Sequence, residues 1–281
     1  MADKLMHLRH TLREMRRVLV AFSGGVDSSF LLCVAAEELG DNVVALTTCS
    51  PTAAGDDETL ARALARALGV RHEVIEANEL EIPGYAENPT DRCYFCKDSL
   101  YRICHAEAAK LDIEHIADGV NADDLGDYRP GLQAAGEQTI RHPLAEAGLS
   151  KQEIRALSRE LGLPTWDKPS SPCLSSRFPY GTPITLESLR RVASAERSLH
   201  RLGFRECRVR FHDPVARIEV PAADLSRLLD AEVRAGVLRE LRALGFLYVT
   251  VDLQGYRTGS LNEGLPQSPA ATAPSAGPLR S

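Results

Sequence analysis

Residues 23–29 read Ser-Gly-Gly-Val-Asp-Ser-Ser, and the context of this stretch decides the fold. A short apolar run at 17–22, typical of a buried strand, leads into it. After it, apolar residues recur at helical spacing over 30–39, Gly40 ends the helix, and 43–48 predict the next strand. The local order is therefore strand, glycine-rich turn, helix, strand.

The same alternation continues to about residue 162, with a helix at 56–68, strands at 70–77 and 115–120, and a helix at 151–161. Ser150 and Glu153 match a capping box in front of the last helix. Such alternation predicts an α/β fold, with a parallel sheet covered by helices on both faces. Ligands of these sheets bind beyond the carboxyl ends of the strands, where the turn at 23–29 lies.

Residues 165–184 hold four prolines and predict a long loop or linker, after which the order of predicted strands and helices changes. Beyond it we expect a helix at 186–202, strands at 207–211 and 216–220, a helix through 244 and a strand at 246–253. This order predicts a smaller α+β domain. The predicted domains are residues 1–180 and 181–262, followed by a Pro/Ala/Ser-rich disordered tail at 263–281.

The composition is that of an ordinary globular protein. The chain has 281 residues, 44% of them hydrophobic, and 33 basic against 39 acidic residues give a net charge of -6. This balance argues against a nucleic-acid partner, and no apolar stretch approaches the roughly 20 residues of a membrane helix. Seven cysteines in a chain of this length favour reduced thiols and a cytoplasmic location.

The turn at 23–29 has the chemistry of a phosphate cradle. Its glycines allow close backbone approach to an anion, and the first N–H groups of the following helix point toward it. It is neither a Walker loop nor a GxGxxG motif, and the alternative is a simple glycine turn with capping side chains. A carboxylate here repels phosphate unless Mg²⁺ lies between them. The candidate phosphate-binding residues are Ser23, Gly24, Gly25, Asp27, Ser28 and Ser29, with Asp27 also the candidate Mg²⁺ ligand.

Cys93 and Cys96 form a CxxC pair, a spacing at which two soft thiolates bind one metal ion or cluster. Further ligands are needed, and Cys173 is a candidate third. The alternatives are a structural Zn²⁺ with Cys104 or His105, or a redox pair. The remaining cysteines, Cys33, Cys49 and Cys207, fall in helix or strand patterns and are expected to be packing residues.

Three motifs resemble one family. Residues 23–29 resemble the signature of the PP-loop ATP pyrophosphatases, and 118–124 with 127–131 look like the second block of those enzymes. The stretch Pro-Cys-Leu-Ser-Ser-Arg-Phe-Pro-Tyr-Gly at 172–181 is similar to the LarE family, sulfur transferases of nickel-pincer nucleotide cofactor synthesis. The resemblance covers about residues 15–262.

This resemblance implies that ATP and Mg²⁺ serve to adenylate the carboxylates of a pyridinium dicarboxylate mononucleotide. Sulfur then attacks the acyl adenylate to give a thiocarboxylate, in two rounds, and pyrophosphate is left at residues 23–29. The physical reason for ATP is that a carboxylate is a poor electrophile, whereas an acyl adenylate carries a good leaving group.

The resemblance leaves two sources of sulfur. In sacrificial members a cysteine at the position of Cys173 gives up its own sulfur and becomes dehydroalanine, and Arg177 could lower the pKa of this thiol. In another branch three cysteines hold a [4Fe-4S] cluster whose open iron carries the transferable sulfide. Because this chain has Cys93 and Cys96 as well as Cys173, we expect the cluster.

Arg208 and Arg210 alternate along a predicted strand, so their side chains share one face. The resemblance assigns them the ribose phosphate of the substrate, with Glu196 as a nearby catalytic residue and Ser176 and Arg177 as substrate-binding residues. It also implies homo-oligomers, hexamers among them, and partner enzymes of nickel-cofactor synthesis. The rival functions are tRNA thiolation and nucleotide sensing without chemistry.

Overall fold

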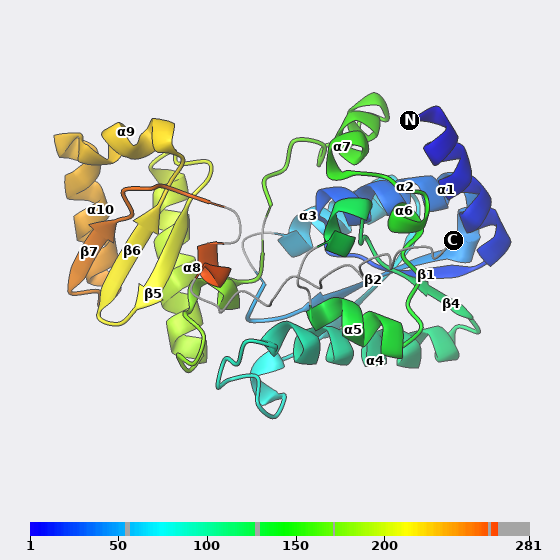
Figure 1. Ribbon diagram of the computed structural model, residues 1–281, viewed down its shortest axis with the longest axis horizontal. Coiled ribbons are helices and arrows are strands. Elements are labelled where there is room, and N and C mark those ends of the chain that lie inside the picture. Colours follow the sequence, from blue (N-terminus) through cyan, green and yellow to red (C-terminus); the bar gives the residue numbers. More distant parts are fainter. Residues whose placement is uncertain (54–56, 127–129, 171, 258–259, 264–281) are drawn as a thin grey trace, which may run out of the picture.

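The computed structural model describes residues 1–53, 57–126, 130–170, 172–257 and 260–263. It has a larger α/β part, which holds the N-terminal half of the chain, and a smaller α+β part beside it (Figure 1). No helix in these ranges is long and apolar enough to cross a membrane. Residues 127–129 of the second motif and all but Glu263 of the predicted tail lie outside the described residues.

The larger part is built on a four-stranded parallel sheet, as the alternating sequence pattern predicts. Its strands are β1 (Val18–Ala21), β2 (Val43–Cys49), β3 (Arg71–Glu76) and β4 (His115–Ala117), in the order β3-β2-β1-β4. The predicted strand at 115–120 is too long. It stops at Ala117 because the Asp118 carboxylate accepts the N–H of Val120 and turns the backbone out of the ladder.

Helices cover both faces of this sheet, which confirms the prediction. On one face lie α1 (Ala2–Met15), α2 (Val26–Leu39), α3 (Asp57–Ala67), α6 (Pro143–Glu146) and α7 (Lys151–Glu160); on the other lie α4 (Arg92–Lys110) and α5 (Pro130–Glu137) (Figure 1). Successive residues of β1 point to opposite faces of the sheet. Val18 packs against the helices of the first face, and Leu19 packs against α4 and α5 on the other.

The sequence analysis did not predict α4, although this helix has 19 residues and carries the CxxC pair. Its buried face is made of Tyr101, Cys104 and Ala108 rather than of large aliphatic residues. The Asp91 side chain at its start makes no capping hydrogen bond. Because its buried face lacks large aliphatic residues, the helix does not show the apolar periodicity on which sequence-based recognition mainly depends.

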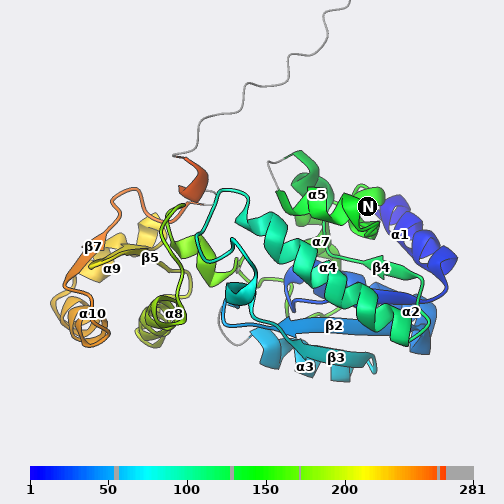
Figure 2. The same cartoon turned by 90° about the horizontal axis from the view of Figure 1, so that it is seen from below.

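The smaller part holds α8 (Leu186–Arg201), β5 (Arg208–His212), β6 (Val215–Glu219), α9 (Leu225–Leu229), α10 (Ala231–Ala243) and β7 (Tyr248–Val251). The β5–β6 hairpin is antiparallel, whereas β6 and β7 are parallel. Figure 2 shows α8 and α10 side by side on one face of this sheet, where they share a single apolar core.

The α+β class of this part is as predicted, with two corrections. The predicted strand at 246–253 is shorter, because Phe246 is a core residue and only 248–251 pair with β6. The predicted helix ending at 244 is two helices, separated at Asp230, whose backbone is extended with ψ 135°. The predicted boundary at residue 180 stays a prediction.

Short 3-10 turns complete the structure, at Gly40–Asn42, Glu79–Glu81, Ala122–Gly126, Leu174–Arg177, Ala222–Asp224 and Ser260–Asn262. One of them interrupts the predicted long loop at 165–184 and carries the residues that follow Cys173. Leu174 and Phe178 of this loop pack into the core of the smaller part.

Candidate active site

The phosphate cradle predicted from residues 23–29 lies between β1 and α2. Gly24 has φ +70°, a left-handed conformation that favours glycine, and Gly25 is the N-cap of α2. The Ser23 hydroxyl accepts the N–H of Gly25 at 3.3 Å and lies 3.1 Å from the hydroxyl of Ser28. The buried Ser29 hydroxyl has no partner among the described residues. The turn thus presents helix N–H groups and hydroxyls toward the carboxyl end of the sheet.

The second predicted motif meets this turn directly. A Cβ at Gly119, just beyond β4, would lie 2.8 Å from the backbone nitrogen of Ser28, so only glycine fits there. The Asn121 amide donates to Asp27 over 3.5 Å. Residues almost 100 positions apart therefore build one edge, as expected for neighbouring parallel strands.

Two lysines that the sequence analysis missed also reach the cradle. Lys151, the first residue of α7, forms an ion pair with Asp27. Lys168 donates to the carbonyl of Gly24 at 2.8 Å. The capping box at Ser150 was a usable signal, because it places the next side chain at a helix start near the sheet edge. These cations add positive charge around a loop that already favours anions.

A buried carboxylate links the cradle to α4. Asp118 accepts hydrogen bonds from the Tyr101 hydroxyl at 2.6 Å and pairs with Nδ1 of His142 at 2.7 Å, while Lys97 lies 3.9 Å away. Burial alone would raise the pKa of this carboxyl, but the His142 hydrogen bond and the Lys97 charge outweigh it and lower the pKa from 3.8 to about 2. Asp118 is therefore a charged anchor between β4 and the helix that carries the CxxC pair.

The structure brings the three predicted ligand cysteines into electrostatic range of one another. Burial is the main cause that raises the pKa of Cys93, and the charge of Cys173 is the second. The same two causes raise the pKa of Cys96 to about 12. Cys93 is nevertheless the most exposed of the three residues. No group of three or more metal-ligating side chains is already assembled within the described ranges.

Backbone contacts explain why these distant cysteines meet. Asn88 is buried and has φ +57°. Its side-chain amide donates to the backbone carbonyls of Pro179 at 2.7 Å and Thr182 at 3.1 Å, and its backbone carbonyl accepts the N–H of Gly181. The Tyr85 hydroxyl lies 2.8 Å from that of Ser175. The segment before α4 is thereby bound along the loop that carries Cys173.

The buried Arg177 side chain is hydrogen-bonded to the backbone of the loop that carries Cys173. Its guanidinium donates to the carbonyls of Pro172 at 2.7 Å and Cys173 at 3.1 Å, and it forms a two-bond ion pair with Glu196 at 2.9 Å. Ser176 also donates to the Cys173 carbonyl, at 2.8 Å. The contacts of Arg177 and Ser176 are thus with the backbone of the loop, and Glu196 balances the charge of the buried arginine.

Of the cysteines predicted to be packing residues, Cys33 and Cys207 are buried as expected. Cys104, named as an alternative zinc ligand, is buried as well. Cys49 departs from the prediction of a packing residue. It lies half-buried at the end of β2, where its thiol donates to the Glu58 carboxylate at 2.8 Å.

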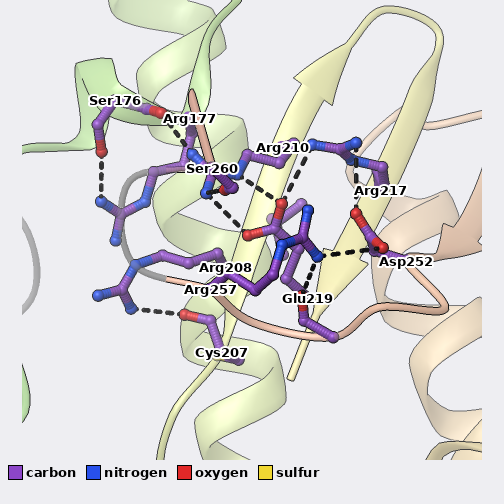
Figure 3. Close-up of polar contacts among 12 residues, drawn as sticks. Ser176, Arg177, Cys207, Arg208, Arg210, Arg217, Glu219, Asp252, Arg257 and Ser260 are labelled. Carbon is purple, nitrogen blue, oxygen red and sulfur yellow. Dashed lines mark hydrogen bonds and ion pairs between the residues drawn. The ribbon is translucent and has the colours of Figure 1, made fainter. Parts of the chain in front are cut away.

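Arg208 and Arg210 lie on one face of β5, both buried, and their surroundings differ (Figure 3). Arg210 forms a two-bond ion pair with Glu219 at 2.9 and 2.8 Å. Arg208 donates to the carbonyls of Cys207 and Ser170 and forms no ion pair with any carboxylate in the described ranges. Burial is the main cause that lowers the pKa of Arg208, and the charge of Arg177 is the second. Within the part of the chain that the structure describes, Arg208 is therefore a buried cation without an ion-pair partner.

Comparison with known proteins agrees with this geometry. The asparagine synthase family model matches residues 8–90, which include the cradle. The pyridinium-3,5-bisthiocarboxylic acid mononucleotide synthase of Lactiplantibacillus plantarum is 40% identical over 97% of this chain and 98% of its own length. The chain belongs to the LarE family. It is accordingly an ATP-using sulfurtransferase.

Other relatives differ in sequence identity and in the share of the chain that they cover. An uncharacterized protein of Synechocystis is 47% identical over 94% of this chain and 98% of its own length. The tRNA-specific 2-thiouridylase of Xanthobacter autotrophicus is 31% identical, over 55% of this chain and 49% of its own length. The likeness to LarE therefore covers both parts of the chain, whereas the likeness to the thiouridylase covers about half of it.

The buried Asp118 of this LarE-family enzyme gives a pH-dependent prediction. Asp118→Asn is expected to lower the free energy of unfolding by about 2 kcal/mol at pH 7, since a carboxyl whose pKa falls on folding stabilises the folded state by about 1.4 kcal/mol per pKa unit. This stabilisation is present above the unfolded pKa of 3.8 and is lost as the pH falls toward about 2. The difference in unfolding free energy between wild type and Asp118→Asn should therefore narrow over that pH range.

Urea unfolding at a series of pH values measures this difference. Asp112→Asn, which alters an exposed carboxylate of the same part, is the control and should change little. A difference between wild type and Asp118→Asn that stays constant from neutral pH down to the acid range would contradict the prediction.

Proposed function

We propose that this enzyme adenylates the carboxylates of pyridinium-3,5-dicarboxylate mononucleotide with ATP and converts them to thiocarboxylates for nickel-pincer cofactor synthesis. The observation that carries the proposal is that one loop joins the ATP cradle to the candidate sulfur site. Lys168, near the start of this loop, donates to the Gly24 carbonyl, and Cys173 follows five positions later in the sequence. The name of the Lactiplantibacillus plantarum relative supports the choice of substrate.

The first step is an attack of a substrate carboxylate oxygen on the α-phosphorus of ATP, with pyrophosphate as the leaving group. The N–H groups at the start of α2 bind the leaving pyrophosphate, and the charges of Lys151 and Lys168 offset its negative charge. Asp27 would hold Mg²⁺, which when bound neutralises phosphate charge. Lys151 now pairs with Asp27 and would move to the phosphates as the metal binds.

Cys93, Cys96 and Cys173 fit a [4Fe-4S] cluster in chemistry, because they offer three soft thiolates in one neighbourhood and leave one iron without a protein ligand. When bound, such a cluster would supply the transferable sulfide. Arg177, through the Cys173 carbonyl, keeps the loop in position, and Asn88 keeps α4 beside it. We therefore propose cluster-borne sulfur for this chain.

The alternative source is Cys173 itself. Its thiolate would attack the acyl carbon and release AMP, forming a thioester. Removal of the Cα proton and cleavage of the Cβ–S bond would then leave a thiocarboxylate and dehydroalanine at Cys173. This route consumes the polypeptide once per sulfur, whereas the cluster route would leave the polypeptide intact and require only a new sulfide for each turnover.

Arg208 supports binding of the substrate's phosphate, since it is buried, bonded to backbone carbonyls and without an ion pair among the described residues, which favours an anionic ligand. Arg210 and Ser176 belong to the same proposed site, because Arg210 donates to the Ser176 carbonyl at 2.7 Å. Glu196 acts in this proposal through Arg177, which it holds in place. We further propose a cytoplasmic homo-oligomer, of hexameric form, that works with the enzymes of nickel-cofactor synthesis.

A second candidate is tRNA thiolation, favoured by the likeness to the tRNA-specific 2-thiouridylase. That likeness covers only 49% of the thiouridylase, and the net charge of this chain is -6. Salt-sensitive retention of tRNA would favour this candidate.

The proposed function is tested with anaerobically purified protein incubated with ATP, Mg²⁺ and the dicarboxylate mononucleotide. Thiocarboxylate product, AMP and pyrophosphate are measured together with the intact mass of the protein. We expect all three products and an unchanged mass at Cys173. Product with loss of the mass of H₂S at Cys173 would assign the sacrificial route, and absence of product would overturn the proposed substrate.

A further inference from the structure

A cross-strand arginine pair on the smaller sheet joins Arg210, which belongs to the proposed substrate site, to Arg217, which has no role in the function proposed so far. Arg210 of β5 and Arg217 of β6 are direct partners in the antiparallel ladder, so their side chains lie on the same face. Like charges opposite each other are destabilising unless an anion lies between them. Glu219 provides one, accepting from Arg210 at 2.9 Å and from Arg217 at 3.1 Å (Figure 3).

These two guanidiniums border a cavity of about 320 Å³, whose polar lining is Arg177, Tyr180, Arg210, His212, Arg217 and Ser260. Its size lies at the lower end of the range for small-molecule sites, enough for a phosphate monoester with part of its sugar. Glu219 is fully buried and is not part of the lining. The carboxylate therefore lies behind the guanidiniums, and the cavity is lined by cationic and neutral polar groups.

Arg217 retains binding capacity toward this cavity. One terminal nitrogen contacts Glu219 at 3.1 Å and the other Asp252 at 3.4 Å, while its buried Nε has no hydrogen-bond partner among the described residues. Glu219 is shared between Arg210 and Arg217, and Arg217 also pairs with Asp252. Asp252 lies 3.8 Å from Arg257 as well, but Arg257 has its own two-bond ion pair with Glu263 at 3.0 and 3.1 Å. The three arginines of the lining therefore face three carboxylates, and the buried donor left without a protein partner among the described residues is Nε of Arg217.

We propose that Arg217 is a substrate-binding residue that, together with Arg210, holds the phosphate monoester of the mononucleotide in this cavity. Paired guanidiniums match the oxygens of a phosphate dianion, and Glu219 positions both of them from behind. This inference rests on the proposed function and deepens it, because it makes Arg217 the residue that selects a nucleotide over its dephosphorylated nucleoside.

The test compares Arg217→Gln with Arg257→Gln. Arg257 shares Asp252 with Arg217 but does not line the cavity, so its substitution removes the same charge nearby and serves as the matched control. Affinities for the dicarboxylate mononucleotide and for its nucleoside are measured by calorimetry on the full chain. We expect Arg217→Gln to weaken mononucleotide binding by about 10- to 100-fold, as for loss of a charged hydrogen bond, and to leave nucleoside binding unchanged. Arg257→Gln should bind both like wild type.

Equal mononucleotide affinity in the two variants would overturn the proposal, and so would an equal loss of mononucleotide and nucleoside binding, which indicates a structural role. Arg217→Lys keeps the charge but not the planar fork, and an intermediate loss would support phosphate contact. If wild type binds neither compound, the proposed function fails separately, and inorganic phosphate becomes the probe. Phosphate binding by wild type and Arg257→Gln but not by Arg217→Gln would then support the cavity, and its absence from wild type would overturn it.

Discussion

Cys173→Ser is expected to abolish thiocarboxylate formation while ATP-dependent adenylation of the substrate continues. A serine hydroxyl neither donates sulfur nor replaces a thiolate at an iron–sulfur cluster, so both sulfur sources are lost. The cradle at 23–29 is intact in this variant. The loop also keeps its conformation, because its anchors are backbone groups: the Cys173 carbonyl binds Arg177, and the Leu174 N–H binds the Thr52 carbonyl at 2.8 Å.

Product is measured by mass spectrometry, AMP by chromatography and iron content by absorbance. Cys49→Ser is the matched control, because that thiol is also half-buried but lies at the end of β2, bonded to Glu58. It should form product like wild type. Thiocarboxylate formed by Cys173→Ser at the wild-type rate would remove Cys173 from the sulfur-transfer chemistry altogether.

Glu196→Ala is expected to lower the free energy of unfolding by about 3–5 kcal/mol, because it leaves the Arg177 guanidinium buried without its counter-ion. The same substitution leaves the Val209 N–H without the carboxylate that it contacts at 3.0 Å. The family resemblance suggests a catalytic role for Glu196, and these contacts instead make it a positioning residue that acts through Arg177.

Urea unfolding measures the effect. The control is Glu240→Ala, which breaks the exposed ion pair with Arg201 in the same part and should cost at most about 1 kcal/mol. The double variant Arg177→Met/Glu196→Leu removes both charges and should recover most of the lost stability. Unchanged stability of Glu196→Ala combined with loss of activity would restore the catalytic interpretation.

The parts of the site that sequence predicted correctly are those built by short-range patterns. The turn at 23–29 joins a strand to a helix within a few residues, and the capping box of Ser150 and Glu153 forms as its spacing indicates. Strand alternation likewise placed Arg208 and Arg210 on one face. In each case the geometry follows from backbone periodicity, which is written in neighbouring residues.

Other features of the site were beyond sequence reasoning because they depend on contacts between distant segments. Lys151 meets Asp27 across 124 positions, and no local pattern marks that pair. The helix that holds Cys93 and Cys96 has a buried face of small and aromatic residues, so its periodicity is weak. Local sequence does not show that Glu219 balances Arg210, or that Arg208 bonds to backbone carbonyls instead of forming an ion pair within the described ranges.

For this protein, sequence by itself determined the fold class, the turn at 23–29 between a strand and a helix, and which side chains are candidates for the chemistry, because these follow from local periodicity and residue chemistry. Tertiary structure decided which of those side chains meet. Asn88, at a positive φ and bonded to the loop at 179–182, brings the CxxC helix to Cys173, and the β5–β6 register sets Arg217 opposite Arg210. Both depend on long-range backbone pairing, whose partners are chosen only when the chain packs.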